Sequence, residues 1–313
     1  MARPRVALLG TPEVALPTFE TLVSLKALDV VITRPDRPSG RGQNLLLSPV
    51  KHRALTLGMP LFQPNDWTES STQDMWDSLK IDLAFVIAYG SILPTWMIDS
   101  CRLGVWNLHF SKLPRWRGAA PVNYAIWKGD EETGVSLMKL SPNLDAGPLL
   151  GYLSRPISLA TDTQSLLTTL AQDGADLIKQ YWPSLLQGSN TLIDQDEKKV
   201  TWAPKLTKAC GDLSPHQPAI EIHRQVRALQ PWPSVEFKLD FERLKIRSVG
   251  LIKPSSLSTG TLSWSHGEGA WLTAGDGNAV ELLLLQRPGK SIQTALQALQ
   301  PWGHQGQRNL QST

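Results

Sequence analysis

The first 160 residues alternate between short apolar runs and longer segments of mixed polarity. The runs "RVALLG", "DVVIT", "DLAFVIA", "GVWNL" and "GVSLMKL" are apolar without regular polar alternation, the pattern of strands covered on both faces. The segments between them have helical periodicity, and several begin with Ser, Thr or Asp where an N-cap belongs: residues 11–25, 48–58, 68–80 and 120–129. This alternation predicts an α/β domain with a mainly parallel sheet.

The pattern changes after residue 160. A long amphipathic helix is expected over residues 163–188, with Asp162 as its cap, and the polar stretch 189–206 has no periodicity. Beyond residue 206, short β-like runs alternate with Gly and Pro, after one helix near residues 220–229. Such spacing is typical of a small barrel or sandwich. We therefore predict a first domain over 1–188, a linker over 189–206 and a second domain over 207–313.

Composition narrows the class of protein. A content of 41% hydrophobic and 19% charged residues is ordinary for a folded protein and argues against a disordered or fibrous chain. The two cysteines match no metal spacing and no disulfide framework, and no apolar run is long enough to cross a membrane. We expect a cytoplasmic protein. Its net charge of +3 comes from residues 207–313, where 11 Lys and Arg face 8 Asp and Glu, which is weak evidence for a nucleic-acid partner.

Polar side chains follow the predicted strand "GVWNL". Asn107 and His109 are two residues apart, so on a strand they point to the same side. An amide and an imidazole that converge on one oxygen would form an oxyanion site. The alternative is that both side chains only satisfy backbone groups at a strand end. Asp145, in "NLDAGPLL", would favour the cationic imidazole if it lay beside His109. From local sequence it is equally a helix cap or a turn residue.

Other common sites find no support. The first strand ends in "GTPEVA", which is neither G-x-G-x-x-G nor a Walker A sequence. Ser111 lies in "HFSKL" rather than in G-x-S-x-G, which argues against a serine hydrolase. The six histidines are scattered, so we expect no metal.

The segment "RPDRPSGRG" carries Arg34, Arg37 and Arg41 on a loop whose Pro and Gly residues exclude a helix. Arginines on such a loop suit phosphate contacts. A solvated surface loop has the same composition, so the segment alone does not decide.

Together these segments resemble the folate-dependent formyltransferases and, within them, the methionyl-tRNA formyltransferase family. "NLHFSKLPRWRGAAP" is similar to the signature N-x-H-x-S-x-L-P-x-x-x-G, "LDAGPLL" to the family's aspartate loop, and "VIAYGSILP" to its pterin-side segment. The resemblance runs nearly end to end and includes "RPDRPSGRG", "VTWAPKL" and "ALQPWPSVEF". It implies a Rossmann-like formyltransferase domain followed by a C-terminal OB-like β-barrel domain that binds tRNA.

The resemblance also implies roles for individual residues. Asn107, His109 and Asp145 would be catalytic, with 10-formyltetrahydrofolate as co-substrate and initiator methionyl-tRNA as acceptor, in a monomer. The arginine loop, Arg34, Arg37 and Arg41, would contact tRNA. Folate contacts would come from two segments: Ala88, Tyr89 and Gly90, with the backbone on the pterin, and Ser111, Lys112, Leu113 and Pro114. Arg115 and Arg117 would meet either the folate tail or the tRNA end.

Several positions depart from the family pattern. Phe110 stands where glycine is common, Lys112 replaces a leucine, Pro148 an acidic residue, and Gln43 and Asn44 replace lysines. None of these departures falls on Asn107, His109 or Asp145, so we expect them to change ligand affinity rather than catalysis. Three other functions remain open: a formyltransferase for an amino-sugar nucleotide, a hydrolase that releases formate from the folate, and an RNA-binding protein without catalysis.

Overall fold

The computed structural model describes residues 3–39 and 44–310, and its contacts divide the chain into two compact units. The first unit comprises residues 1–118, 133–155 and 167–202, and the second comprises residues 119–132, 156–166 and 203–313. Each unit therefore contains segments from more than one part of the sequence.

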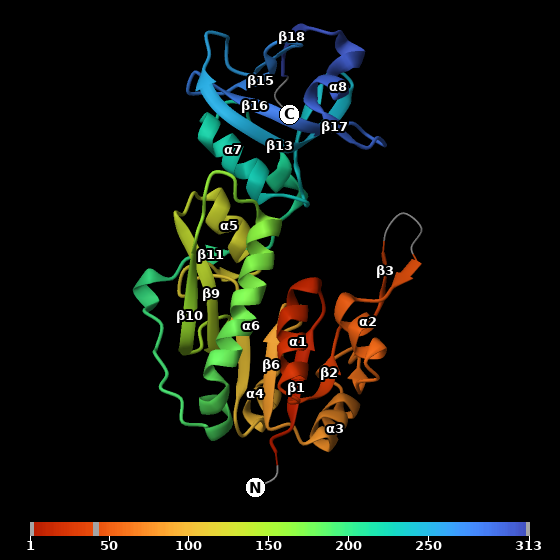
Figure 1. Ribbon diagram of the computed structural model, residues 1–313, viewed down its shortest axis with the longest axis vertical. Coiled ribbons are helices and arrows are strands. Elements are labelled where there is room, and N and C mark those ends of the chain that lie inside the picture. The colour runs from red at the N-terminus through yellow and green to blue at the C-terminus, as the bar shows by residue number, and fades with distance from the viewer. Residues whose placement is uncertain (1–2, 40–43, 311–313) are drawn as a thin grey trace. The chain divides into compact units, whose positions relative to one another are not determined.

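A seven-stranded sheet forms the centre of the first unit, in the order β10-β9-β7-β6-β1-β2-β5 (Figure 1). The pairs β1–β2, β1–β6, β2–β5 and β6–β7 are parallel, and β7–β9 is antiparallel. The strands are β1 (Val6–Gly10), β2 (Leu28–Ile32), β5 (Leu61–Phe62), β6 (Leu83–Ile87), β7 (Val105–His109), β9 (Glu132–Lys139) and β10 (Leu149–Pro156). All residues of β1 and β6 are buried, as their uniformly apolar sequences predict.

Helices connect these strands. They are α1 (Leu16–Ser24), which follows the short η1 (Glu13–Ala15), then α2 (Pro49–Thr56), α3 (Ser70–Leu79), α4 (Thr95–Ser100) and α6 (Thr163–Gln187). Ser48 caps α2, where its hydroxyl accepts a hydrogen bond from the Lys51 amide at 3.1 Å. Asp162 similarly accepts from the Ser165 amide at 2.8 Å ahead of α6. Both caps confirm what the sequence predicts.

The order of the strands determines where a ligand fits. From β1 the chain moves outward to β2 and β5 and then returns to β6 on the other side of β1. The loops that leave β1 and β6 therefore diverge at the carboxyl edge of the sheet. In sheets of this type, ligands bind in the crevice at such a switch point.

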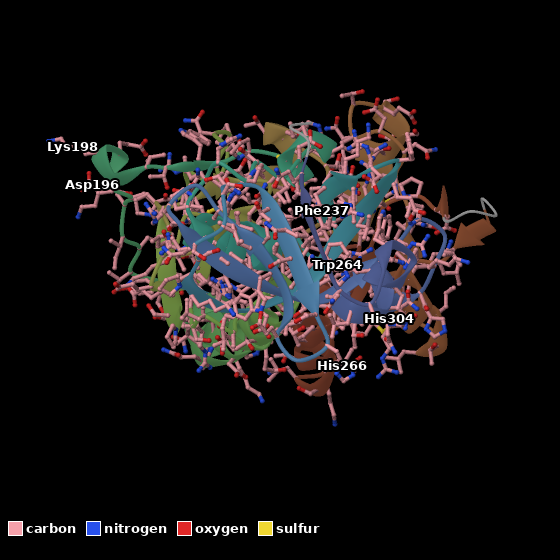
Figure 2. The ribbon with its side chains drawn as sticks, turned by 90° about the horizontal axis from the view of Figure 1, so that it is seen from above. Asp196, Lys198, Phe237, Trp264, His266 and His304 are labelled. Carbon is pink, nitrogen blue, oxygen red and sulfur yellow. The ribbon has the colours of Figure 1, made fainter. Side chains whose placement is uncertain are left out.

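An antiparallel sheet dominates the second unit, in the order β12-β13-β16-β15-β14-β18, with β17 paired to β16. The strands are β12 (Val235–Leu239), β13 (Glu242–Pro254), β14 (Thr261–Ser265), β15 (Gly269–Thr273), β16 (Asn278–Gln286), β17 (Ile292–Thr294) and β18 (Gly306–Asn309). Register shifts between β13 and β16 bend this sheet, whose buried face includes Phe237 and Trp264 (Figure 2).

Three helices complete the second unit with η3 (Lys208–Gly211) and η4 (Gln300–Trp302): α5 (Pro121–Trp127), α7 (Ala219–Ala228) and α8 (Ala295–Leu299). α5 packs against α7, and the Asn123 amide donates a 2.7 Å hydrogen bond to the carbonyl of Ala228. The sequence gives no sign of this pairing, because α5 follows the first-unit strands directly.

The predicted fold class is confirmed: a mainly parallel α/β sheet precedes a curved antiparallel β unit. Several short elements escaped prediction, among them α4, β10, β17, β18 and the hairpin of β3 (Arg37–Ser39) and β4 (Asn44–Leu46). The segment read as an aperiodic linker carries η2 (Glu197–Lys199) and β11 (Trp202–Ala203), which pairs with β8 (Arg117–Gly118). No helix among the described residues is long and apolar enough to span a membrane.

Candidate active site

Asn107 and His109 lie on β7, between β6 and β9. Register pairs Asn107 with Val86 on one side and with Met138 on the other, so the backbone at this position is held from both neighbours. The two side chains are on the same side of the strand because they are two residues apart. His109 is 6% exposed, whereas Asn107 is only half-buried. Within the described residues the Asn107 amide has no hydrogen-bond partner, so it is available to a ligand.

Both ring nitrogens of His109 face an acceptor. The Nε2–H donates a 2.8 Å hydrogen bond to the carbonyl oxygen of Trp116, which fixes the proton on Nε2. Nδ1 lies 3.6 Å from Oδ2 of Asp145, whose side chain is 11% exposed. The carboxylate and the imidazole therefore face each other in a largely buried part of the site.

Asp145 lies in a tight turn between β9 and β10. Its backbone is left-handed, with φ of 51°, which is uncommon for a residue with a side chain. Oδ2 accepts a 2.8 Å hydrogen bond from the Gly118 amide, which aligns the carboxylate with His109. A Cβ at Gly147 would lie 1.8 Å from the Lys139 carbonyl, so only glycine fits there. From the sequence, Asp145 could be a helix cap or a turn residue. In the structure it lies in a turn, and its carboxylate also faces the imidazole of His109.

The segment Ala88–Gly90 leaves β6 at the switch point. Ala88 and Gly90 are exposed and left-handed, with φ of 47° and 79°. Tyr89 between them is buried, and its hydroxyl accepts a 3.1 Å hydrogen bond from the indole of Trp67. Burial raises the pKa of Tyr89. Ala88 and Gly90 can therefore offer backbone contacts to a ligand while Tyr89 anchors the turn.

The segment Ser111–Pro114 follows β7. Ser111 is fully buried and donates a 2.6 Å hydrogen bond to the Arg115 carbonyl, while Leu113 packs with Met138 and Leu149. Lys112 lies over the Tyr152 ring at 5.4 Å. Ser111 and Leu113 thus fix the loop from inside, and Lys112 and Pro114 are the more accessible members.

The structure separates the three arginines of the Arg34–Arg41 segment. Arg34 lines a cavity of about 330 Å³ together with Thr11, Pro35, Asp36, Leu46, Ser48 and Gly90. Arg37 opens β3, and its backbone pairs with Leu46 of β4. Arg41 lies outside the described residues. The sequence assigns Arg34 to the tRNA and Gly90 to the folate. In the structure the two residues line one cavity at the switch point.

Two backbone groups and two arginines make contacts around the site that the sequence did not reveal. The Trp116 carbonyl and the Gly118 amide are backbone groups, which no side-chain motif signals. Arg117 is 3% exposed, and its guanidinium binds Gln195 and Glu197 within the protein. Arg115 is exposed and stacks over Trp116, with its Cζ atom 4.4 Å from the ring centroid.

The arrangement suits chemistry in which negative charge develops on an oxygen. It offers the side-chain amide of Asn107, an imidazole with a carboxylate partner and, at the switch point, a cavity that Gly90 lines. Among the described residues, no group of three or more His, Cys, Asp or Glu side chains is placed to hold a metal ion.

Comparison with known proteins gives a consistent picture. The sequence matches the Formyl transferase family over residues 18–181 and the Formyl transferase C-terminal domain over residues 205–301. A relative from Methylococcus capsulatus, named methionyl-tRNA formyltransferase, is 39% identical over 305 residues, covering 97% of this chain and 99% of its own. A relative of the same name from Ectopseudomonas mendocina is 40% identical over 288 residues, or 91% of this chain and 90% of its own.

Solved structures share the fold at lower identity. WlaRD, described as a sugar 3N-formyl transferase, has a TM-score of 0.68 at 16% identity and covers 93% of this chain and 100% of its own. The N-formyltransferase from Helicobacter canadensis, in complex with folinic acid and dTDP-3-aminofucose, has a TM-score of 0.67 at 15% identity, covering 91% and 99%. At such identity the likeness establishes the arrangement of the chain and not its acceptor.

Proposed function

The chain belongs to the formyl transferase family, and from that premise we propose that it transfers the formyl group of 10-formyltetrahydrofolate to methionine on initiator tRNA. The acceptor is supported by relatives that are 39% and 40% identical over nearly the whole chain and bear the name methionyl-tRNA formyltransferase. The observation that carries the chemistry is the His109–Asp145 pair on the same side of β7 as the amide of Asn107, which has no hydrogen-bond partner in residues 3–39 and 44–310.

The reaction forms one C–N bond and breaks another. The α-amine of methionine attacks the formyl carbon of the folate, which gives a tetrahedral carbon that bears an oxyanion. A free α-amine has a pKa of about 7.7–8.0, so a useful fraction is already neutral near pH 7. The protein must therefore stabilise the oxyanion and move a proton from the attacking nitrogen to the leaving nitrogen.

We assign the stabilisation to Asn107 and His109. Asn107 donates a neutral hydrogen bond to the oxyanion, and its amide is available without breaking another bond. His109 supplies positive charge and a second donor. Since its Nε2–H donates to the Trp116 carbonyl at 2.8 Å, donation to the oxyanion requires exchange of that bond. Asp145, or a water that it holds, relays the proton.

The folate occupies the side of the site formed by the backbone of Ala88–Gly90 and the loop Ser111–Pro114. Exposed, left-handed Ala88 and Gly90 suit hydrogen bonds to the pterin. Lys112 and Pro114, the more accessible members of this loop, contact the folate, whereas buried Ser111 and Leu113 set the shape of the loop.

The tRNA is held by cations from both units. Arg34, Arg37 and Arg41 contact its phosphates, and the positive excess past residue 206 adds a weaker attraction from the C-terminal OB-like domain. The cavity that Arg34 shares with Gly90 admits the end of the acceptor near the folate. The protein acts as a cytoplasmic monomer.

The test offers one formyl donor to several acceptors. The protein is incubated with 10-formyltetrahydrofolate and, in turn, methionyl initiator tRNA, methionyl elongator tRNA, an amino-sugar nucleotide, or water alone, and the formylated product is measured. We expect formylation of the initiator tRNA. Formylation of the sugar nucleotide instead, release of formate alone, or tRNA binding without product would support the rival functions.

A further inference from the structure

The polar segment that follows α6 runs back along the first unit toward the catalytic pair. Figure 1 shows it beside β10 before it reaches η2 and β11. Ile193 and Leu149 exchange backbone hydrogen bonds of 2.9 and 2.8 Å, which joins the segment to the start of β10. Asp196 and Lys198, on its outer side, point outward (Figure 2). Its inner side therefore faces the loops that hold the site.

Gln195 spans the turn that contains Asp145. Its Nε2 group donates one hydrogen bond to the Asp145 carbonyl at 2.8 Å and another to the Gly147 carbonyl at 2.7 Å. The two N–H groups of the side-chain amide thus bind the carbonyls of the residues on either side of Ala146. A carboxamide has two such protons and a carboxylate has none, so the site requires glutamine rather than glutamate.

Arg117 fixes Gln195 from the opposite side. Its Nε and Nη2 donate to Oε1 of Gln195 at 3.1 and 2.9 Å, and its remaining donors reach Glu197 at 2.7 and 3.2 Å. The next residue, Gly118, donates its amide to the Asp145 carboxylate. The backbone carbonyl and the carboxylate of Asp145 are therefore held by one connected group of residues.

Thr201 holds Trp116, whose carbonyl is the hydrogen-bond partner of His109. Its hydroxyl accepts a 2.9 Å hydrogen bond from the Trp116 amide, and its carbonyl accepts one from the Arg117 amide at 2.9 Å. Trp116 in turn accepts the Nε2–H of His109. One segment thus constrains both acceptors around the imidazole.

We propose that Gln195 is a positioning residue for the formyl transfer proposed above: it holds Asp145 in its left-handed turn and so keeps the carboxylate on His109. A left-handed backbone at a residue with a side chain persists only where its surroundings impose it. Without the two hydrogen bonds from Gln195, the turn relaxes and Oδ2 moves away from the imidazole. The inference rests on the proposed catalytic role of Asp145.

The experiment compares Gln195→Met and Gln195→Glu with a matched control in the second unit. Gln225, which is buried whereas Gln195 is half-buried, donates to the carbonyls of Cys210 and Asp212 at 2.8 and 3.4 Å and accepts from Gln217 at 2.8 Å. Gln225→Met therefore removes a similar set of bonds far from Asp145 in sequence. Melting temperature, kcat and both KM values are measured on the full chain.

We expect both Gln195 variants to lose about 10–100-fold in kcat, the usual consequence of a small misplacement of a catalytic group. Both KM values should stay within about twofold, because the displaced group acts on the transition state. Gln225→Met should lower the melting temperature and leave kcat unchanged. In an Asp145→Asn background, Gln195→Met should have almost no further effect on kcat, since the two changes act through the same group.

Full kcat in both folded variants would overturn the positioning role, and so would a loss that persists unchanged in the Asp145→Asn background. Failure of both variants to fold would assign Gln195 to stability instead and also overturn it. The parent protein separates the two proposals. If it transfers no formyl group to methionyl-tRNA, the proposed function fails. If it does and the variants match it, only the positioning role fails.

Discussion

Two regions at the carboxyl edge of the first sheet differ in how far hydrogen bonds within the protein fix their side chains. Around His109, each ring nitrogen faces an acceptor, and those acceptors are themselves held by Gly118, Gln195 and Thr201. Around Arg34, only the backbone is fixed: its amide donates to Thr11 at 3.3 Å and its carbonyl accepts from Gln63 at 2.8 Å. Among the described residues its guanidinium makes no hydrogen bond or ion pair.

The difference follows from the tasks proposed for the two regions. Charge that develops during a reaction is stabilised best by groups that are already in place, because their rearrangement would add to the barrier. At this site only the Nε2–H of His109 has to exchange one hydrogen bond, from the Trp116 carbonyl to the oxyanion. A phosphate is charged before it binds, so a cation can meet it from several positions. We therefore expect changes near His109 to act on kcat and changes near Arg34 to act on affinity.

The largest effect should come from the two proposed oxyanion donors. Asn107→Ala and His109→Ala should each lower kcat by ~10²–10³, the usual cost of one such donor. Folate affinity should change far less, since the donors act on charge that is present only in the transition state. Steady-state kinetics with both substrates checks this. A raised KM with an unchanged kcat would assign the two residues to ground-state binding.

Asp145→Asn should also reduce activity severely. The amide keeps the size of the side chain but removes the negative charge that faces Nδ1 of His109 at 3.6 Å, so kcat should fall with little change in either KM. Kinetic constants of both proteins are measured under the same conditions. Full activity in the variant would leave Asp145 as a turn residue only.

The second unit offers a test of stability that is independent of catalysis. Burial, with Arg227 beside it, lowers the pKa of His223 to about 4. The unfolded chain therefore takes up a proton at this ring near its ordinary value of 6.5, and the folded chain does so only near 4. Stability should fall as the pH drops through this window, by on the order of 2–3 kcal/mol from this residue.

Denaturant unfolding of the parent and His223→Gln at pH 7 and pH 5 measures this dependence. The variant should be less stable at pH 7, because it loses the hydrogen bond that Arg227 donates to Nδ1 at 3.1 Å. It should also lose less stability than the parent on acidification. An equal loss in both proteins would place the acid-sensitive groups elsewhere.

The smallest effect is expected in the arginine segment. Arg41→Ala should weaken tRNA binding modestly and lower the slope of log affinity against log salt by about one. Arg34→Ala should do the same. It also tests the shared cavity, since a change in folate KM would show that Arg34 reaches the folate side. Equal tRNA binding by parent and both variants at every salt concentration would remove this segment from the tRNA site.

The sequence predicted the parts of the site that follow from regular geometry. The period of a strand places Asn107 and His109 on one side, and the uniformly apolar β1 and β6 indicated buried parallel strands. β10 escaped because its sequence, "LLGYLSRP", is only partly buried and contains Gly and Pro. The role of Gln195 escaped because its segment is polar and aperiodic, and its partners are backbone carbonyls brought together by folding.

Other predictions remain as they were. The bounds of the functional domains, with a linker over 189–206, and the roles of the individual site residues are still predictions. Arg117 is the clearest revision: sequence suggested contact with the folate tail or the tRNA end, whereas its buried guanidinium binds Gln195 and Glu197. Charge alone did not distinguish a ligand-binding arginine from one that supports the active site.

The most direct test of the contrast between the two regions measures kcat and tRNA affinity side by side for Asp145→Asn and Arg41→Ala. We predict that Asp145→Asn loses most of its kcat and binds methionyl initiator tRNA like the parent. Arg41→Ala should bind the tRNA more weakly and, at saturating tRNA, transfer the formyl group at the parent rate. If both variants lose kcat and affinity in the same proportion, the separation of a prearranged catalytic region from a phosphate-binding region is contradicted.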